Sequence, residues 1–139
     1  MKIITGVAIG AAFGAATSLA NALSSPYSPL GAPITGTVWA GAAKVLSLLM
    51  DSGWAWAALA VAAGWLARTW ARGIPAGALA LMAATAAYYV MDASVRDEPL
   101  AWYESELVLW WAASVLFGTA LGAVGAAIRR PGQSVCSPR

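Results

Sequence analysis

The sequence has no histidine, only one cysteine (Cys136) and few charged residues. With neither histidine nor a second thiol, a zinc or haem site and an internal disulfide are not expected. Charged residues make up 10% of the 139 residues, whereas soluble domains contain about 25%. The net charge of +2 is too small, and its bases too scattered, for a nucleic-acid interface. We therefore expect no metal, no cofactor and no nucleic-acid partner.

Hydrophobic residues make up 60% of the chain, and eight tryptophans are among them. This composition indicates a membrane protein, because tryptophan concentrates at membrane interfaces. Four runs that are apolar on all sides are candidate spans: 3–23, 54–70, 74–91 and 107–128. Gly73 and Pro75 are expected to mark the turn between the second and third spans.

The stretch from Thr37 to Asp51 differs from these runs because it is amphipathic. At helical spacing Lys44 and Ser47 share one side with Asp51, whereas Trp39 and Leu49 lie on the other. Crossing the membrane would bury Lys44 at a cost of about 2.5–3.5 kcal/mol. Fifteen residues also reach only about 22 Å, less than the ~30 Å hydrocarbon core. A flat or re-entrant helix is therefore favoured, with a fifth span as the alternative.

These patterns predict an all-α membrane protein with four transmembrane helices plus one amphipathic interfacial or re-entrant helix. The membrane domain is expected to cover residues 1–130, and the polar segment 131–139 to form a disordered cytoplasmic tail. The first run has an alternative interpretation. Lys2 and the small residues Ala20 and Ala22 also fit a secretory signal peptide that is cleaved near this point.

The charges predict how the chain is oriented. If both termini are cytoplasmic and 37–51 lies outside, all six acids are outside with only Lys44 and Arg96 as basic neighbours. The remaining bases are then inside: Lys2, Arg68, Arg72, Arg129, Arg130 and Arg139. This distribution follows the positive-inside rule. It predicts a multi-pass protein of the bacterial inner (cell) membrane with a cytoplasmic C-terminus.

Small residues recur every four positions in the first and last runs. We call Gly6, Gly10 and Gly14 the first ladder, and Gly118 and Gly122 the second. Such spacing lets the backbone of another helix approach closely, so we expect both ladders to pack against helices. The facing helix could belong to the same chain or to another copy. A glycine-lined permeation path is the alternative interpretation.

One polar cluster is a candidate for chemistry on the outer face: Tyr88, Asp92, Glu104 and Glu106. Paired carboxylates could bind a cation or act as acid and base. The alternative is a solvated acidic loop whose carboxylates stabilise a helix N-terminus. No nucleophile elbow, phosphate loop or metal-spaced cluster occurs in the sequence. The polar residues inside the spans can all bond back to their own helices: Thr5, Thr17, Ser18, Thr85, Ser114 and Thr119.

Four stretches, Gly6–Ser18, Asp51–Gly64, Ala76–Tyr89 and Phe117–Arg130, together resemble a family of small bacterial membrane proteins from high-GC genomes. They include D-S-G-W-A-W-A-A-L-A-V-A-A-G and the ending I-R-R. The family is known only as a domain of unknown function, so the resemblance implies a multi-pass helical fold and transfers no catalytic residues. Family members continue after the Arg-Arg pair, which implies that this chain has a truncated or divergent end.

The sequence favours a structural or accessory membrane protein that packs with itself or with a partner membrane protein in the lipid bilayer. No catalytic residue is assigned. A small transporter or channel subunit that acts as an oligomer is the alternative, because glycine-rich helices could form a pore or carrier as a dimer. The absence of charge at mid-depth in the spans argues against it. A membrane-embedded enzyme that uses the outer-face carboxylates is a third interpretation.

Overall fold

The computed structural model describes residues 2–128, and all regular structure in that range is helical. The elements are α1 (Lys2–Ser24), η1 (Ala32–Ile34), α2 (Val38–Met50), α3 (Gly53–Ala67), α4 (Trp70–Arg96), η2 (Leu100–Tyr103) and α5 (Glu104–Ile128). Three helical segments are long and apolar enough to cross a membrane: Ile3–Ser24, Trp70–Arg96 and Leu100–Ile128. The all-helical class and the membrane-length helices are as predicted. The predicted tail, 131–139, lies outside the described residues.

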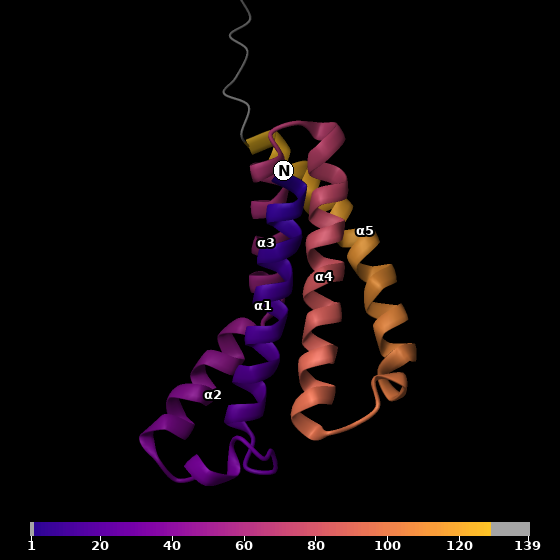
Figure 1. Ribbon diagram of the computed structural model, residues 1–139. Coiled ribbons are helices and arrows are strands. Elements are labelled where there is room, and N and C mark those ends of the chain that lie inside the picture. The colour runs from indigo at the N-terminus through magenta and orange to yellow at the C-terminus, as the bar shows by residue number, and fades with distance from the viewer. Residues whose placement is uncertain (1, 129–139) are drawn as a thin grey trace, which may run out of the picture.

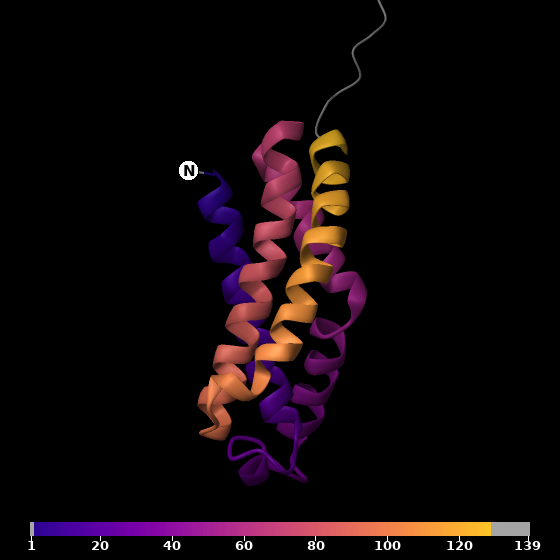
Figure 2. The same ribbon diagram turned by 90° about the vertical axis from the view of Figure 1, so that its right-hand side faces the viewer.

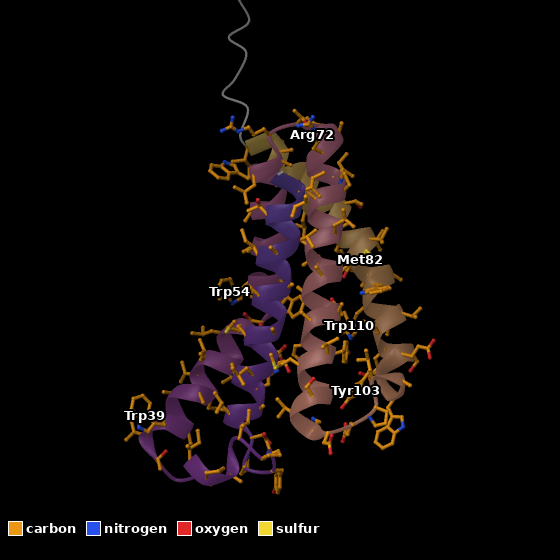
Figure 3. The ribbon with its side chains drawn as sticks, in the orientation of Figure 1. Trp39, Trp54, Arg72, Met82, Tyr103 and Trp110 are labelled. Carbon is orange, nitrogen blue, oxygen red and sulfur yellow. The ribbon has the colours of Figure 1, made fainter. Side chains whose placement is uncertain are left out.

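The long helices run side by side, and the chain reverses direction at each end of the bundle (Figures 1 and 2). α1 and α4 run one way, whereas α3 and α5 run the other, so α1 begins at the same end where α5 stops. We call this the arginine end, because Arg68 lies in its α3–α4 turn and Arg72 in the first turn of α4, as Figure 3 shows for Arg72. The opposite end holds Asp97 and Glu98, and we call it the acidic end.

Helix α4 lies at the centre of the bundle and contacts α1, α3 and α5. Its buried positions are mostly small residues, among them Ala76, Ala80 and Ala84. The largest completely buried side chains of the described residues are Thr17 and Ser18. Because lipid provides no hydrophobic drive between helices, close backbone contact between small residues is the main source of packing energy here.

Apart from Gly6, the glycines of both ladders face α4, and the two ladders do not face each other. A Cβ atom added at Gly14 would lie 2.8 Å from the Ala84 Cα atom, and Gly10 packs in the same way on Ala80 one turn earlier. Gly118 packs against Ala78, where an added Cβ would lie 2.6 Å from its Cα atom. Gly6 is looser, since its Cβ would be in ordinary contact with Ala63 of α3 at 3.5 Å. Within the described residues, the helices facing these ladders therefore belong to the same chain.

The amphipathic stretch forms α2, which rises obliquely beside the acidic-end half of α1 (Figure 1). Its buried contact is Ser47, whereas Trp39, Val45 and Leu49 are exposed. Ser47 thus faces inward together with the half-buried Ala40 and Ala43, whereas Lys44 is exposed like the large apolar side chains. α2 and α3 meet at a bend of 57°. Together they are long and apolar enough to cross a membrane, whereas α3 alone, with 15 residues, is too short. The bundle thus has three membrane-length helices, or four if this bent pair counts as one.

The α3–α4 turn was predicted at Gly73 and Pro75, and this is wrong. α3 ends at Ala67, Arg68 adopts a left-handed conformation with φ of 68°, and α4 begins at Trp70. Pro75 therefore lies inside α4, where its missing N–H leaves one helical hydrogen bond unmade. Gly73 is buried against α5, with an added Cβ only 2.6 Å from Ala126 Cβ. Glycine here serves helix packing and not a turn, which sequence spacing alone does not distinguish.

Candidate binding cleft

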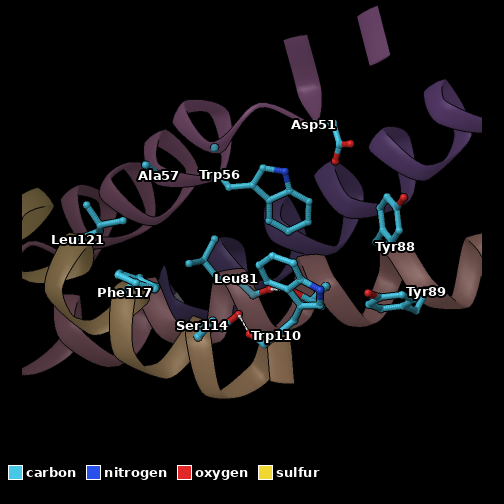
Figure 4. Close-up of a pocket in the computed structure, with 13 residues that line it drawn as sticks. Asp51, Trp56, Ala57, Leu81, Tyr88, Tyr89, Trp110, Ser114, Phe117 and Leu121 are labelled. Carbon is cyan, nitrogen blue, oxygen red and sulfur yellow. Dashed lines mark hydrogen bonds between the residues drawn. The ribbon is translucent and has the colours of Figure 1, made fainter. Parts of the chain in front are cut away.

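A cleft of about 490 Å³ opens between α3, α4 and α5 in the acidic-end half of the bundle (Figure 4). Leu81, Thr85, Tyr88 and Tyr89 contribute from α4. The walls come from α3 and its N-terminal flank and from α5: Asp51, Gly53, Trp56, Ala57, Trp110, Ala113, Ser114, Phe117 and Leu121. This volume lies in the range of small-ligand sites, about 300–1,000 Å³.

The cleft exists because α5 is held close to its neighbours at one end and apart from them at the other. Near the arginine end, Gly122 meets Gly64 of α3, where an added Cβ on Gly64 would lie 2.7 Å from Gly122 Cα. Toward the acidic end the residues facing the cleft are bulky, and α3 itself begins only at Gly53. Trp111 fixes this half of α5 on α4, since its Nε1 donates a hydrogen bond of 3.2 Å to the Met82 carbonyl.

The cleft has a closed floor and an open side. Leu81 and Thr85 are 7% and 5% exposed, whereas Trp110 and Phe117 on α5 are 53% and 60% exposed. A molecule could therefore enter between α3 and α5 without any helix moving. The lining is largely apolar and aromatic, and Asp51 is the one charged side chain among the described residues that form it.

A hydrogen-bonded group on α1, α2 and α4 lies beside the polar end of the cleft. The Asn21 amide Nδ2 donates to the Tyr88 hydroxyl at 3.1 Å, and Asn21 Oδ1 accepts a hydrogen bond from the Ser47 hydroxyl. One amide thus joins three helices. It explains why α2 turns Ser47 inward, because a polar side chain buried in an apolar bundle needs a partner.

A second connection joins α4 to α5. The Tyr89 hydroxyl donates to Glu106 Oε2 at 3.1 Å, and the Tyr88 and Tyr89 rings meet edge to face at 5.4 Å. Close by, the Tyr103 hydroxyl donates to Glu98, and its ring centroid lies 5.5 Å from that of Tyr89. The acidic end is therefore held together by tyrosine hydroxyls and carboxylates.

Within the described range, no side-chain hydrogen bond joins two members of the outer-face cluster proposed from the sequence. The side-chain hydrogen bonds of its members each lead outside the set of four: Tyr88 pairs with Asn21, Asp92 with Arg96, and Glu106 with Tyr89. Asp92 also forms an ion pair of 3.0 Å with Arg96 along the same helix. Glu104 lies in the first turn of α5, where a carboxylate favours the helix dipole.

The described polar residues inside the spans mostly bond back to their own helices. The hydroxyls of Thr17, Thr85, Ser114 and Thr119 each donate to a carbonyl four residues earlier, at 2.7–2.8 Å. Ser18 differs, because its hydroxyl is buried and has no hydrogen-bond partner in the structure. No group of three or more histidine, cysteine, aspartate or glutamate residues in the range 2–128 could hold a metal.

Comparison with protein-family models, with curated proteins and with solved structures finds no match for this chain. The resemblance to a high-GC bacterial family therefore stays a prediction based on the motifs alone. The cleft is therefore the feature of the molecule that indicates a function.

Sequence reasoning missed the cleft and several residues around it, namely Asn21, Ser47, Asp51, Trp56 and Trp110. The sequence did contain one indication of this site, namely Asn21. An asparagine inside an apolar run is costly unless it finds a partner. The tryptophans were interpreted as interface anchors. The sequence alone does not show how α3 and α5 are rotated, and this rotation is what brings Trp56 and Trp110 to the same cleft.

Proposed function

We propose that this chain is a non-catalytic multi-pass membrane protein that binds an elongated apolar molecule in the cleft between α3 and α5. The observation that carries this proposal is the cleft's aromatic and apolar lining, which is contributed by three helices and has one open side. Pockets of this kind bury most of a small ligand's surface and orient it through a few polar groups. An accessory role in which the bundle presents this molecule to a partner protein fits the same geometry.

We further propose four crossings with both termini on one side, which departs from the flat helix favoured by the sequence because α2 then belongs to a crossing. In this arrangement α2 and α3 form one bent crossing, since a 15-residue α3 spans only about 22 Å of a ~30 Å core. The arginine end would face the cytoplasm, because Arg68 and Arg72 lie there and five of the acids, Asp92 through Glu106, lie toward the other end. The cleft would then open toward the outer half of the bilayer.

Binding can be tested by filling the cleft. The probe is (5,5-dimethylhexyl)benzene, a neutral apolar molecule, titrated into the protein in nonionic maltoside micelles with empty micelles as the blank. We expect saturable binding that Ala113→Phe removes, because Ala113 lines the cleft. The matched control is Ala112→Phe, whose side chain is exposed beside the cleft and should leave binding unchanged. Equal binding by both variants, or none by the parent protein, contradicts the proposal.

Orientation is tested with single cysteines in a Cys136→Ser background. A cysteine at Ala101 should react with a membrane-impermeant thiol reagent in intact cells, because Ala101 lies exposed in η2 at the acidic end. A cysteine at Arg72 should react only after the membrane is opened. The reverse labelling pattern inverts the proposed orientation, and labelling of both positions in intact cells contradicts a membrane crossing by α4, which separates them.

A further inference from the structure

The lining of the cleft changes character along its length. Phe117 and Leu121 lie toward one end, whereas Asp51, Tyr88 and Tyr89 gather toward the other, with Trp56 and Trp110 between them (Figure 4). A ligand that matches this gradient has an apolar body and one polar head. The charges and rings at the polar end indicate the sign of that head.

The electrostatics of the polar end favour a cation. Asp51 is the one charged group among the described lining residues, and Glu106 lies one helical turn before Trp110 with its carboxylate on the Tyr89 hydroxyl. Arg96, the base nearest to these groups on α4, already pairs with Asp92. Lys44 precedes Asp51 by two helical turns, and no ion pair joins them among the described residues. Attraction between unlike charges is strengthened by apolar surroundings.

The aromatic rings favour the same kind of head. Trp56, Trp110, Tyr88 and Tyr89 come from three helices and border one space. The face of an aromatic ring attracts a cation, with tryptophan the strongest, and aromatic cages beside a carboxylate are a known way to recognise quaternary ammonium groups. Phe13 packs against the Trp56 ring edge to face, with the ring centroids 5.4 Å apart.

We propose that the cleft binds a free amphipathic organic cation, with one ammonium-type centre held by Asp51 and the surrounding rings and an alkyl or aryl body toward Leu121. This inference rests on the proposed function, since it names the class of molecule that the cleft takes. The volume of about 490 Å³ suits a small single-chain molecule and is too small for a two-chain phospholipid. The ligand that fits the cleft is therefore a free cation and not the headgroup of a lipid.

The test compares two molecules of the same shape and different charge. One is 4-phenylbutyl-trimethylammonium, and the other is (5,5-dimethylhexyl)benzene, in which a carbon replaces the charged nitrogen. Both are titrated calorimetrically into the full chain in nonionic maltoside micelles, with empty micelles as the blank. We expect the cation to bind about tenfold more tightly than its neutral counterpart.

Variants then locate the charge recognition. Asp51→Asn should remove the preference for the cation and leave the affinity for the neutral molecule unchanged, whereas Asp51→Glu should retain the preference. The control is Asp97→Asn, which removes an acid at the same end that does not line the cleft and places asparagine in a left-handed conformation it adopts readily. Trp110→Leu should lower the affinity for the cation more than the affinity for the neutral molecule. Asp51 accepts no side-chain hydrogen bond within the described residues, so its asparagine variant should fold.

The outcomes separate this inference from the proposed function. Equal affinities for the two molecules, or an Asp51→Asn variant that keeps the preference, overturn the cation assignment and leave an apolar cleft. Failure of both molecules to bind overturns the proposed function as well. Displacement of the cation by phosphatidylethanolamine added to the micelles would overturn the choice of a free cation, because a lipid headgroup would then occupy the site.

Discussion

The two halves of this bundle are built on different principles. In the arginine-end half, Gly64, Gly73, Gly122 and Gly125 bring α3, α4 and α5 into backbone contact, and a Cβ added at Gly125 would lie 2.8 Å from Trp65 N. In the acidic-end half the same three helices diverge around aromatic side chains and leave a cleft. There specific hydrogen bonds, such as Asn21 to Tyr88, also join the helices, although Gly14 of α1 still packs closely on Ala84 of α4. Close packing leaves no space between α3, α4 and α5 in one half, whereas the other half contains the cleft.

This contrast has a physical origin. Small residues gain packing energy only when two backbones come close, which leaves no space between them. Large aromatic residues keep backbones apart, and hydrogen bonds can then hold helices at longer range. A membrane bundle that needs both stability and a cavity can therefore divide the two tasks between its ends.

The largest loss of stability should follow from breaking the close-packed half. We expect Gly122→Leu to destabilise the protein by at least the roughly 1–3 kcal/mol typical of overpacked cores, because the new side chain meets the backbone of α4. Gly10→Leu should act similarly against Ala80. Thermal unfolding in detergent measures both changes.

The matched control is Gly41→Leu. Gly41 lies on an exposed side of α2, and nothing is within 4 Å of a Cβ added there. Leucine also favours a helix more than glycine does, so the unfolding temperature should stay the same or rise. If the Gly10, Gly41 and Gly122 variants all melt at the parent temperature, close packing is not what stabilises the bundle.

An intermediate effect is expected at the acidic end. Asn21→Leu removes the amide that joins α1 to α2 and α4, leaving the hydroxyls of Ser47 and Tyr88 without this partner. Hydrogen bonds between membrane helices contribute about 0.6 kcal/mol on average and up to about 1.7, so we expect a loss of about 1–2 kcal/mol for the two.

For comparison, Thr119→Val removes a hydroxyl that bonds only within its own helix, to Val115 and Leu116. Its effect on stability should stay within about 0.5 kcal/mol. An Asn21→Leu variant that is no less stable than Thr119→Val would mean that α2 is held by its apolar contacts and not by the amide.

The smallest effect should come from the ion pair of Asp92 and Arg96. The Arg96 side chain is 55% exposed, and both residues lie on one helix, so the pair does not join elements. We expect Asp92→Asn to change the free energy of unfolding by about 0.3–0.5 kcal/mol at low salt and by less at high salt. A loss well above about 1 kcal/mol, independent of salt, would instead give Asp92 a role in holding the acidic end together.

The sequence by itself determined the class of protein and the presence of its long helices. Apolar runs of membrane length exclude most other folds, because a bilayer requires each backbone group to be bonded within a helix or a closed barrel. The spacing of Gly10 and Gly14 also indicated which side of α1 could approach another helix. These properties are local, so they can be inferred from neighbouring residues along one helix.

Tertiary structure decided the rest. Gly73 and Pro75 have the composition of a turn, yet they lie inside α4 because α5 packs against this part of the helix. Ser47 belongs to a stripe that could equally face water, and in the structure it faces inward, where it donates a hydrogen bond to Asn21. The cleft depends on how three helices diverge, and divergence is set by contacts between residues far apart in sequence. Periodicity along one helix contains no information about the distance to the next.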